Sequence, residues 1–598
     1  MEGTELWTAL LAAAAAIALG SVGTAAPLRL VEDGKSRYCI VIAKDASPSE
    51  HFAAAEFKRY IQQISGATLP YAPDGPNPPA KAVMIGDSEA FRSLKLSMPA
   101  DASGDEAYLI RTSGERFVIV GGRLRGTMYG VYSFLEDALG CRWLSQKADK
   151  IPSLSNITVP NLDIVEKPAF EYRDVFIREA MNKEYASRNK GNSANAGLDA
   201  ARGGSIGYYP FVHTFASLVP LDKYWDAHPE YFSMINGKRT RQNTQLCLTN
   251  PDVLKIATET VLGWMRDHPE AELYSVSQND CYNNCQCDRC KAIDEEEGSP
   301  SGLVLRFVNA IAEETEKTYP DKLIDTLAYQ WTEKPPKITK PSHNVRVRLC
   351  PIFCCEAHPY EKCDAPENKA FLENLSNWAK VTDQLYIWHY NTSFAHYLNP
   401  FPDFRQLADS ARLYKRAGVK GIFWEGSYPP GGGGELGLLR AYLLSKLSWN
   451  PDVDAEAVMK GFCSDYYGAA GRFIWGYVQL LEDKVTKDNI HMKIWAAPTD
   501  AFLTPEIIAQ ADRLFDSAES AAESAEILDR VRQARLSIEY VKLMQPIMRN
   551  EFKGKEAQFA ARLDAFVARC RGYGMTHISE GEGLDAFHAR VKKQLTGS

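Results

Sequence analysis

The sequence predicts an α/β fold, a (β/α)8 TIM barrel with an α/β domain before it and a helical domain after it. Strand candidates alternate with helical patterns between residues 171 and 428, a shorter α/β pattern precedes them, and helical patterns alone follow residue 450. A chain of 598 residues also exceeds one ordinary hydrophobic core, so separate domains are expected. The predicted boundaries are a signal peptide at 1–26, the α/β domain at 27–165, the barrel at 166–450 and the helical domain at 451–598.

The amino-terminal segment has the pattern of a secretory signal peptide. Residues 6–20 are mostly apolar, and small residues follow as far as Ala26. Glu2 and Glu5 stand where Lys or Arg is usual, which leaves a membrane anchor or a misassigned start as alternatives. We therefore expect an exported protein that is periplasmic, on the cell surface or secreted. After Ala26 the sequence predicts no membrane span, because no apolar run reaches 18 residues.

The first folded domain shows alternating strand and helix patterns. The predicted strands are 39–42, 82–86, 107–112 and 116–120, and the predicted helices are 51–64 and 125–139. A proline-containing linker then leads into the barrel.

Eight strands are predicted for the barrel, at 172–177, 207–213, 244–248, 273–277, 323–329, 345–349, 385–389 and 419–424. Helices are predicted between them at 251–267, 302–318, 368–380 and 404–417, and in the last domain at 455–467, 470–484, 505–525, 526–545 and 557–571. The active site of such a barrel lies at the carboxyl ends of its strands, so the residues there are the candidates for function.

Composition and charge narrow the classes of partner. The net charge of -8 on 598 residues creates no field that would gather nucleic acid. The 11 Trp and 28 Tyr favour a sugar ligand, since the C–H faces of sugar rings stack on aromatic rings, although most aromatic residues serve as core. The expected partner is an oligosaccharide or a glycoprotein glycan.

Two acidic residues at strand ends are the candidate catalysts. Asp280 follows the fourth predicted strand and Glu425 ends the eighth, and cleavage of a glycosidic bond needs a proton donor and a second group that stabilises positive charge. The structural alternatives are a turn cap for Asp280 and a salt bridge for Glu425. Glu179 and Glu356 are held in reserve.

Polar and aromatic residues at the same strand ends are predicted to bind substrate. They are Arg178, Glu179, His213, Asn279, Tyr329, Trp331, Trp388, His389, Tyr390 and Trp424. The histidines, His396 included, lack the spacing of a metal centre, so hydrogen bonding to substrate or a structural role is expected of them.

The cysteines suggest a loop staple. Cys281, Cys285, Cys287 and Cys290 are spaced either for disulfides or for a structural zinc ion, and the sequence favours neither. No cofactor is expected to be required for catalysis.

Several short runs resemble a known family. They are FVHTF at 211–215, HPEYF at 228–232, SQND at 277–280, CQCDRC at 285–290 and NPFP at 399–402. Together they resemble glycoside hydrolase family 163, formerly uncharacterised domain family 4838, over about residues 170 to 470. Residues 38–150, with GTMYG at 126–130 and GCRW at 140–143, resemble the amino-terminal domain of α-glucuronidases and β-hexosaminidases.

The resemblance implies a barrel hydrolase, specifically an endo-β-N-acetylglucosaminidase that cuts the chitobiose core of complex N-glycans. A 2-acetamido group in the substrate would allow its own carbonyl oxygen to attack the anomeric carbon, which predicts retention of configuration. Asp280 with Asn279 would orient that group and Glu425 would be the acid/base, or Asp280 and Glu425 would exchange roles. The alternatives are an exo-acting glycosidase on uronic acids or amino sugars, with Arg178 or Arg348 as a basic clamp, and a non-catalytic carbohydrate-binding protein.

Overall fold

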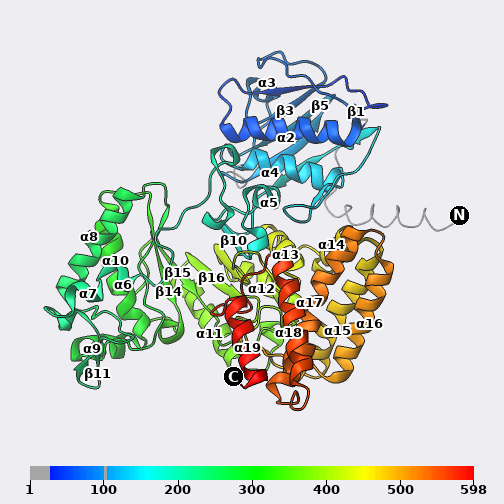
Figure 1. Cartoon of the computed structure of the whole chain (residues 1–598). Coiled ribbons are helices and arrows are strands. Elements are labelled where there is room, and N and C mark those ends of the chain that lie inside the picture. The colour runs from blue at the N-terminus through cyan, green and yellow to red at the C-terminus, as the bar shows by residue number, and fades with distance from the viewer. Residues whose placement is uncertain (1–26, 100–103, 598) are drawn as a thin grey trace. The chain divides into compact units, whose positions relative to one another are not determined.

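The computed structural model describes residues 27–99 and 104–597, which form two compact units (Figure 1). The first comprises the described residues up to Arg142 together with Ile151–Lys167 and Ala200–Gly203. The second comprises Trp143–Lys150, Pro168–Asp199 and the chain from Gly204 onward, so the central sheet and the carboxyl-terminal helices belong to one unit. The predicted signal segment lies outside the described residues. No helix of the described chain is long and apolar enough to cross a bilayer.

The first unit contains a five-stranded mixed sheet and confirms the predicted α/β pattern. The strand order is β2 (Cys39–Ile42), β3 (Ala82–Ile85), β5 (Arg116–Gly121), β4 (Tyr108–Ser113) and β9 (Asp163–Glu166), with β4 antiparallel to both neighbours. Its helices are α2 (Pro48–Ser65), α3 (Glu89–Ser93) and α4 (Gly126–Ser133), and β1 (Leu28–Val31) pairs with β8 (Ile157–Val159). The short strands β6 (Arg142–Trp143) and β7 (Asp149–Lys150) also pair, and of these residues Trp143 and all of β7 belong to the second unit.

Helix α2 starts where the sequence supplies a capping box. The Ser47 hydroxyl accepts from the backbone N–H of Glu50, and the Glu50 carboxylate accepts from the N–H of Ser47. Phe57, Tyr60 and Ile61 are fully buried on one face of the helix. Local capping and the apolar stripe therefore specify the same helix.

The second unit is built on a six-stranded parallel sheet. Its order is β10 (Tyr172–Phe176), β17 (Gly421–Glu425), β16 (Leu385–Tyr390), β15 (Val345–Leu349), β14 (Leu323–Ala328) and β13 (Leu273–Ser275). These six strands confirm six of the eight predicted ones.

The other two predicted strands are wrong, and the described residues do not form a regular eight-stranded barrel. Between β10 and β13 the parallel pairing is limited to two isolated bridges, Ser193 to Ile206 and Tyr208 to Leu273, so the predicted strand at 207–213 is reduced to one bridge. The predicted strand at 244–248 is not in this sheet, since Leu246 bridges antiparallel to Phe232. Glycines and polar side chains that bond to backbone, as Thr244 does, explain the irregular path.

Helices cover the sheet and continue to the carboxyl terminus (Figure 1). In the sheet region they are α5 (Lys183–Arg188), α6 (Phe215–Leu218), α7 (Leu221–Tyr224), α8 (Pro251–Asp267), α9 (Asp288–Glu297), α10 (Pro300–Glu316), α11 (Pro366–Val381), α12 (Phe404–Arg416) and α13 (Gly437–Trp449). The later ones are α14 (Ala455–Tyr467), α15 (Gly471–Lys487), α16 (Pro505–Ala521), α17 (Ala525–Met548), α18 (Glu556–Gly572) and α19 (Leu584–Thr596), and the hairpin β11 (Met234–Ile235) and β12 (Lys238–Arg239) lies in a loop. The nine predicted helices of this unit are confirmed, with small shifts at their ends.

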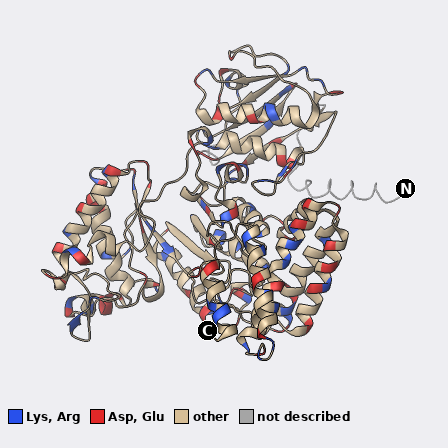
Figure 2. Cartoon of the chain, in the orientation of Figure 1, with Lys and Arg blue, Asp and Glu red and all other residues tan. Residues whose placement is uncertain are grey.

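Acidic and basic side chains are intermixed along the helices of each unit (Figure 2). This distribution agrees with the small net charge of the chain.

A buried ion pair stabilises the inside of the sheet. Arg348 of β15 and Asp325 of β14 are both fully buried, with Nε and Oδ1 3.5 Å apart. The hydroxyl of Tyr208 donates to the same Asp325 oxygen at 3.2 Å and also accepts from Arg348. Because Tyr208 belongs to one of the irregular bridges, the pair attaches that segment to the regular strands.

Replacing the buried cation should destabilise the second unit. We expect Arg348→Met to lower the free energy of unfolding by about 3 to 5 kcal/mol, because Asp325 would lose its charged partner in a dry interior. Lys487→Met is the control, since Lys487 pairs with Asp483 at 2.9 Å on the surface and its loss should cost less than about 1 kcal/mol. Urea unfolding monitored by tryptophan fluorescence compares the two, and equal effects would contradict the assignment.

Candidate active site

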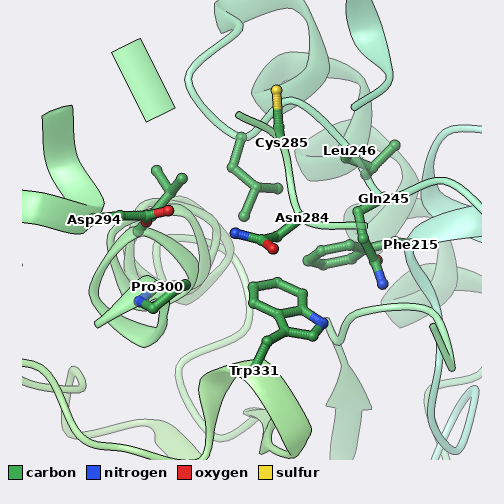
Figure 3. A pocket seen from close by; sticks show the side chains of 10 residues that line it. Phe215, Gln245, Leu246, Asn284, Cys285, Asp294, Pro300 and Trp331 are labelled. Atoms are coloured by element: carbon green, nitrogen blue, oxygen red, sulfur yellow. The ribbon is translucent and has the colours of Figure 1, made fainter. Parts of the chain in front are cut away.

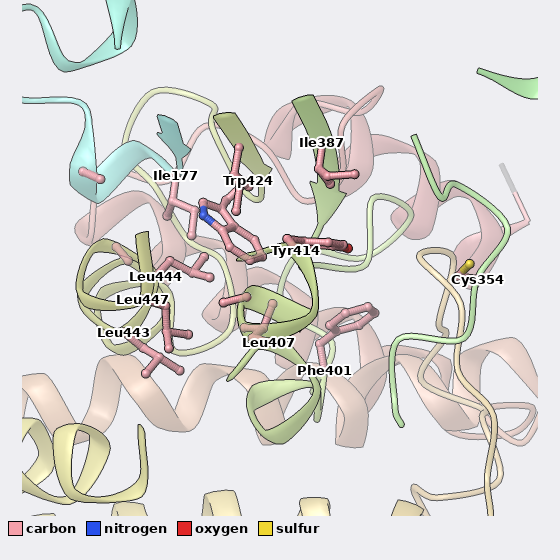
Figure 4. Close-up of a cluster of buried hydrophobic side chains, with 14 of the residues drawn as sticks. Ile177, Cys354, Ile387, Phe401, Leu407, Tyr414, Trp424, Leu443, Leu444 and Leu447 are labelled. Carbon is pink, nitrogen blue, oxygen red and sulfur yellow. The ribbon is translucent and has the colours of Figure 1, made fainter. Parts of the chain in front are cut away.

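Alternation along β16 and β17 decides which side chains reach the inner end of the sheet. Successive strand residues face opposite sides. Glu425 lies on the inner side with Trp388, whereas Trp424 lies on the outer side, where its indole donates to Ser448 of α13 at 2.9 Å. Figure 4 shows Trp424 among the apolar side chains between the sheet and its helices.

Two of the predicted substrate-binding residues are therefore wrong. Trp424 and His389 are both fully buried on the outer side. His389 Nδ1 lies 2.7 Å from the hydroxyl of Tyr414 on α12, and burial lowers the pKa of His389 to about 3. Each is one residue away from a strand residue that faces the site, so alternation along the strand directs both side chains to the opposite face.

Glu425 is a buried carboxyl group held by one strong donor. Its side chain accepts a hydrogen bond from Trp388 Nε1 at 2.7 Å, and the residue is only 8% exposed. Burial raises the pKa of Glu425 to about 8, with smaller contributions from the charges of Glu580 and Asp280, while the Trp388 hydrogen bond acts in the opposite direction. At neutral pH this carboxyl group is mostly protonated.

Gly426 allows the chain to turn directly after this carboxyl group. A Cβ at residue 426 would lie 2.6 Å from Oδ1 of Asn391 and 2.7 Å from the side chain of Ile177. The backbone N–H of Gly426 donates to Phe176 of β10, and the carbonyl of Glu425 accepts from the N–H of Asn391. The neighbouring strands thus fix the position of Glu425 from both sides.

Asp280 supplies the second carboxylate at the mouth of the sheet. It is exposed, five residues after the end of β13, and accepts a hydrogen bond from the hydroxyl of Tyr329 at 3.0 Å. Gln330 donates to the same hydroxyl at 2.9 Å. Gln330 has a left-handed backbone (φ 53), a conformation that non-glycine residues adopt at a cost and that often marks functional sites.

His213 lies beside this pair. Its ring centroid is 5.9 Å from that of Tyr329, and its Nδ1 lies 2.8 Å from the carbonyl oxygen of Gln278. A carbonyl only accepts, so Nδ1 carries a proton. His213 also has a left-handed backbone (φ 56).

Glu580 is a third carboxylate that the sequence did not suggest. It comes from the loop between α18 and α19, where its N–H donates to the carbonyl of Phe394 at 2.9 Å. Burial raises the pKa of Glu580, opposed by a hydrogen bond from Tyr428, and the charge of Asp280 raises it further. Glu580 was not predicted because it lies in the helical region, far along the sequence from the predicted strand ends.

Tyr390 and Trp388, two of the predicted substrate-binding residues, lie on the same side of the sheet as Glu425. Tyr390 is the register partner of Glu425 on the adjacent strand, and both aromatic residues are nearly buried. The charges of Glu425 and Asp280 add to burial in raising the pKa of Tyr390. Trp388 thus contacts Glu425 directly, and Tyr390 lies close enough to both carboxyl groups for their charges to act on it.

Asn279 and Trp331 have structural partners. The Asn279 amide donates to the carbonyl of Thr244 at 2.8 Å and accepts from the N–H of Ala216 at 2.9 Å, so both of its polar atoms hold loops. The Trp331 indole donates to the carbonyl of Cys281 at 3.1 Å. Trp331 also lines a small pocket with Phe215 (Figure 3), which places its ring against the loop region after β13.

The remaining acidic and basic candidates differ in exposure. Arg178 is exposed after β10, and its N–H donates to the carbonyl of Ser427. Burial raises the pKa of Glu179, which lies against Gly432 in the glycine-rich loop. Glu356 is fully buried and accepts from Tyr360 at 2.8 and 2.9 Å, so it cannot reach a substrate.

Exposed aromatic rings occur near the carboxylates. Tyr282 follows Asp280 by two residues and is 55% exposed. Trp495 is 47% exposed and follows Ile494, which packs in the same buried cluster as Trp388 and Tyr390. Such rings are suited to stacking on sugars.

Three of the four predicted cysteines lie together, and Cys281 is not in their group. The thiols that converge are Cys247, Cys285, Cys287 and Cys290, all buried, with Sγ atoms within 4.8 Å of one another. Cys281 instead lies 3.2 Å from the carbonyl of Asn243. Cys247 is 40 residues before Cys287, and the loop that brings it close has no signature in the sequence.

Comparison with known families identifies the second unit. Residues 143–479 match the family described as "Domain of unknown function (DUF4838)", which is more than half of the chain. The chain belongs to the DUF4838 family. Residues 31–134 match "Glycosyl hydrolase family 67 N-terminus". Comparison with curated proteins gives no match.

Two solved structures share the fold of this DUF4838 protein. One is described as "A novel family GH115 4-O-Methyl-alpha-glucuronidase, BtGH115A, with specificity for decorated arabinogalactans", with 11% identity, a TM-score of 0.56 and coverage of 92% of this chain and 78% of that one. The other is described as a "GH138 enzyme targeting pectin rhamnogalacturonan II", with 10% identity, a TM-score of 0.51 and coverage of 94% and 79%. At these identities the likeness is one of fold.

Trp388 should tune the acidity of Glu425. We expect Trp388→Phe to raise the pKa of Glu425 above its value of about 8, because the indole N–H stabilises the ionised carboxylate. Trp424→Phe is the matched control on the opposite face and should leave that pKa unchanged. Infrared titration of the protonated carboxyl band, assigned with Glu425→Gln, measures it. An unchanged or lowered pKa in Trp388→Phe would contradict the role.

Proposed function

We propose that this protein is a glycoside hydrolase in which Glu425 is the general acid and Asp280 assists the reacting sugar. The observation that carries the proposal is the contrast between the two carboxyl groups. Glu425 is buried and protonated at neutral pH, and Asp280 is exposed and accepts a hydrogen bond from Tyr329. Carboxyl groups in different environments at one mouth of the sheet are suited to divide acid and charge-stabilising roles.

We propose further that the chain belongs to glycoside hydrolase family 163 and is an endo-β-N-acetylglucosaminidase acting on N-glycans. The proposal rests on the resemblance of its sequence runs, including SQND at 277–280, and on the exposed rings of Tyr282 and Trp495, which could stack on an extended glycan. The predicted signal segment supports an exported enzyme that meets glycoprotein glycans outside the cell or in the periplasm.

The proposed reaction uses the substrate's own acetamido group. Its carbonyl oxygen attacks the anomeric carbon while the bond to the leaving oxygen breaks and Glu425 donates its proton to that oxygen. Asp280 accepts the acetamido N–H and stabilises the resulting oxazolinium ion. Ionised Glu425 then takes a proton from water as the water attacks the anomeric carbon and opens the ring, which gives retention. The raised pKa of Glu425 favours this assignment over the exchanged one.

The two alternative functions have weaker support. Arg348 cannot act as a clamp for a uronic acid, because it is fully buried and paired with Asp325. That leaves Arg178 as the basic residue for an exo-acting enzyme. A protein that only binds carbohydrate would have no use for a buried, protonated Glu425.

We also propose a structural zinc ion at Cys247, Cys285, Cys287 and Cys290. Cys247 Sγ lies 3.7 Å from that of Cys287 and 3.9 Å from that of Cys290. Thiolates about 2.3 Å from a tetrahedral zinc ion are separated by about 3.8 Å, so this arrangement favours zinc over disulfides. The proposed ion takes no part in catalysis, because four protein ligands leave no coordination position open for water or substrate.

The activity is tested by incubating the chain without residues 1–26 with released and protein-linked complex N-glycans. Mass spectrometry should show a product that ends in a single reducing N-acetylglucosamine. Removal of single terminal sugars would favour the exo-acting alternative, and binding without any cleavage would favour the carbohydrate-binding one.

Substitution of either carboxyl group should lower turnover without unfolding the chain. Glu425→Gln should reduce kcat by about 10²- to 10⁴-fold, the range for loss of a general acid, and Asp280→Asn should also reduce kcat strongly. Asp294→Asn is the control, because Asp294 is a partly buried carboxyl group whose pKa burial also raises, to about 6, but it lines the pocket of Figure 3. Near-normal turnover in Glu425→Gln would contradict the proposal.

The pH dependence should follow the protonated form of Glu425. Its pKa is raised to about 8, so the acid is available below that pH, and kcat/KM should fall as the pH rises through about 8. Initial rates across this range, with a buffer control at constant ionic strength, check the profile. A basic limb that stays flat well above pH 8 would be inconsistent with Glu425 as the proton donor.

A further inference from the structure

A second group of metal-binding side chains lies in the second unit, away from the four cysteines. Cys355, His358, Cys363 and His491 converge so that one ligand atom from each lies within 4.8 Å of the others. The first three belong to the loop after β15, and His491 comes from the segment after α15. The group therefore joins parts of the chain that are more than 120 residues apart.

The separations suit a tetrahedral zinc ion. His358 Nδ1 lies 3.6 Å from Cys355 Sγ and 3.9 Å from Cys363 Sγ, and His491 Nδ1 lies 3.6 Å from Cys363 Sγ. Sulfur at about 2.3 Å and nitrogen at about 2.0 Å from a tetrahedral ion lie about 3.5 Å apart. The side chains thus already have the spacing that the ion requires.

The outer ring nitrogens of both histidines have acceptors, as zinc ligands usually do. His358 Nε2 lies 3.2 Å from the carbonyl of Val485, and His491 Nε2 lies 3.0 Å from Asp364 Oδ1. Protons on Nε2 leave both Nδ1 atoms free to bind a metal. The backbone N–H of Met492 points to Cys355 Sγ at 3.4 Å, a contact that stabilises a thiolate.

We propose that Cys355, His358, Cys363 and His491 bind a structural zinc ion. Two thiolates and two imidazoles complete a tetrahedron, so no position remains for water or substrate and the ion takes no part in catalysis. Binding of this ion crosslinks the loop after β15 to the segment that follows α15.

The crosslinked segment supports one wall of the candidate active site. The carbonyl of Met492 accepts from the N–H of Glu356 at 2.8 Å, and the carbonyl of Ile494 accepts from the N–H of Phe394 at 2.8 Å. Phe394 in turn packs against Tyr390. The metal thereby holds the backbone that carries Ile494 and the exposed Trp495 beside the inner ends of β16 and β17.

The test is the metal content of the full chain, purified without added chelator and measured by inductively coupled plasma mass spectrometry. Two zinc ions per chain are expected, one for each of the two ligand groups. Cys363→Ser and His491→Ala should each reduce the content to one, whereas Cys247→Ser should remove the other ion. Cobalt substitution adds a spectroscopic readout, because thiolate ligands give a charge-transfer absorption. The part of this absorption that is lost in Cys363→Ser should correspond to a site with two thiolate ligands.

Matched variants separate metal binding from misfolding. Cys354→Ser is the control, since Cys354 is a buried neighbour whose Sγ points to the carbonyl of Glu367 and not to the ligand group, and it should retain both ions. His491→Cys should also retain both, because a third thiolate can replace the imidazole. Full zinc content in Cys363→Ser and His491→Ala would overturn the proposal. The proposal would also be overturned if the purified chain contained no zinc and had a disulfide between Cys355 and Cys363. The disulfide would be seen as the loss of two hydrogens in the intact mass.

Discussion

The burial of one carboxyl group, Glu425, is the constraint on which the candidate site depends. A carboxyl group in a dry wall of aromatic rings is neutral at physiological pH, and the single indole N–H of Trp388 limits how far its pKa rises. Both side chains face inward because β16 and β17 pair in a register that places Tyr390 beside Glu425. The pairing of β16 and β17 therefore determines which side chains face inward, and through them the acidity of Glu425.

The rest of the second unit keeps that wall closed. The loop between α18 and α19 reaches the site through Glu580, and the segment after α15 contributes Ile494. The carboxyl-terminal helices are thus part of the site's construction rather than an appendage, which agrees with their belonging to the same compact unit as the sheet. A zinc ion at His491 would add a crosslink to this arrangement.

Local pattern explains what the sequence predicted correctly. Six strands and nine helices of the second unit have clear periodicity, and the strand-end argument placed Asp280, Glu425 and Tyr329 at one mouth. His213 lies beside Tyr329 although the strand predicted to end at His213 is wrong. The strand-end argument was wrong for His389 and Trp424 because one residue of register decides which face a side chain occupies. Local patterns did not indicate Glu580, and they indicated Cys281 in place of Cys247 for the cysteine group. Long loops bring Glu580 and Cys247 into place without a local signal. The two irregular strands failed for the same reason, since isolated bridges leave no periodicity.

The most direct test of Glu425 as proton donor is the turnover of Glu425→Ala on two substrates that differ only in leaving group. One carries the natural sugar alcohol and the other an electron-poor phenol that departs without protonation. The account predicts a loss of about 10²- to 10⁴-fold on the natural substrate, with little loss in the bond-breaking step of the activated one. Equal losses on both substrates would contradict it and would assign the proton to another group.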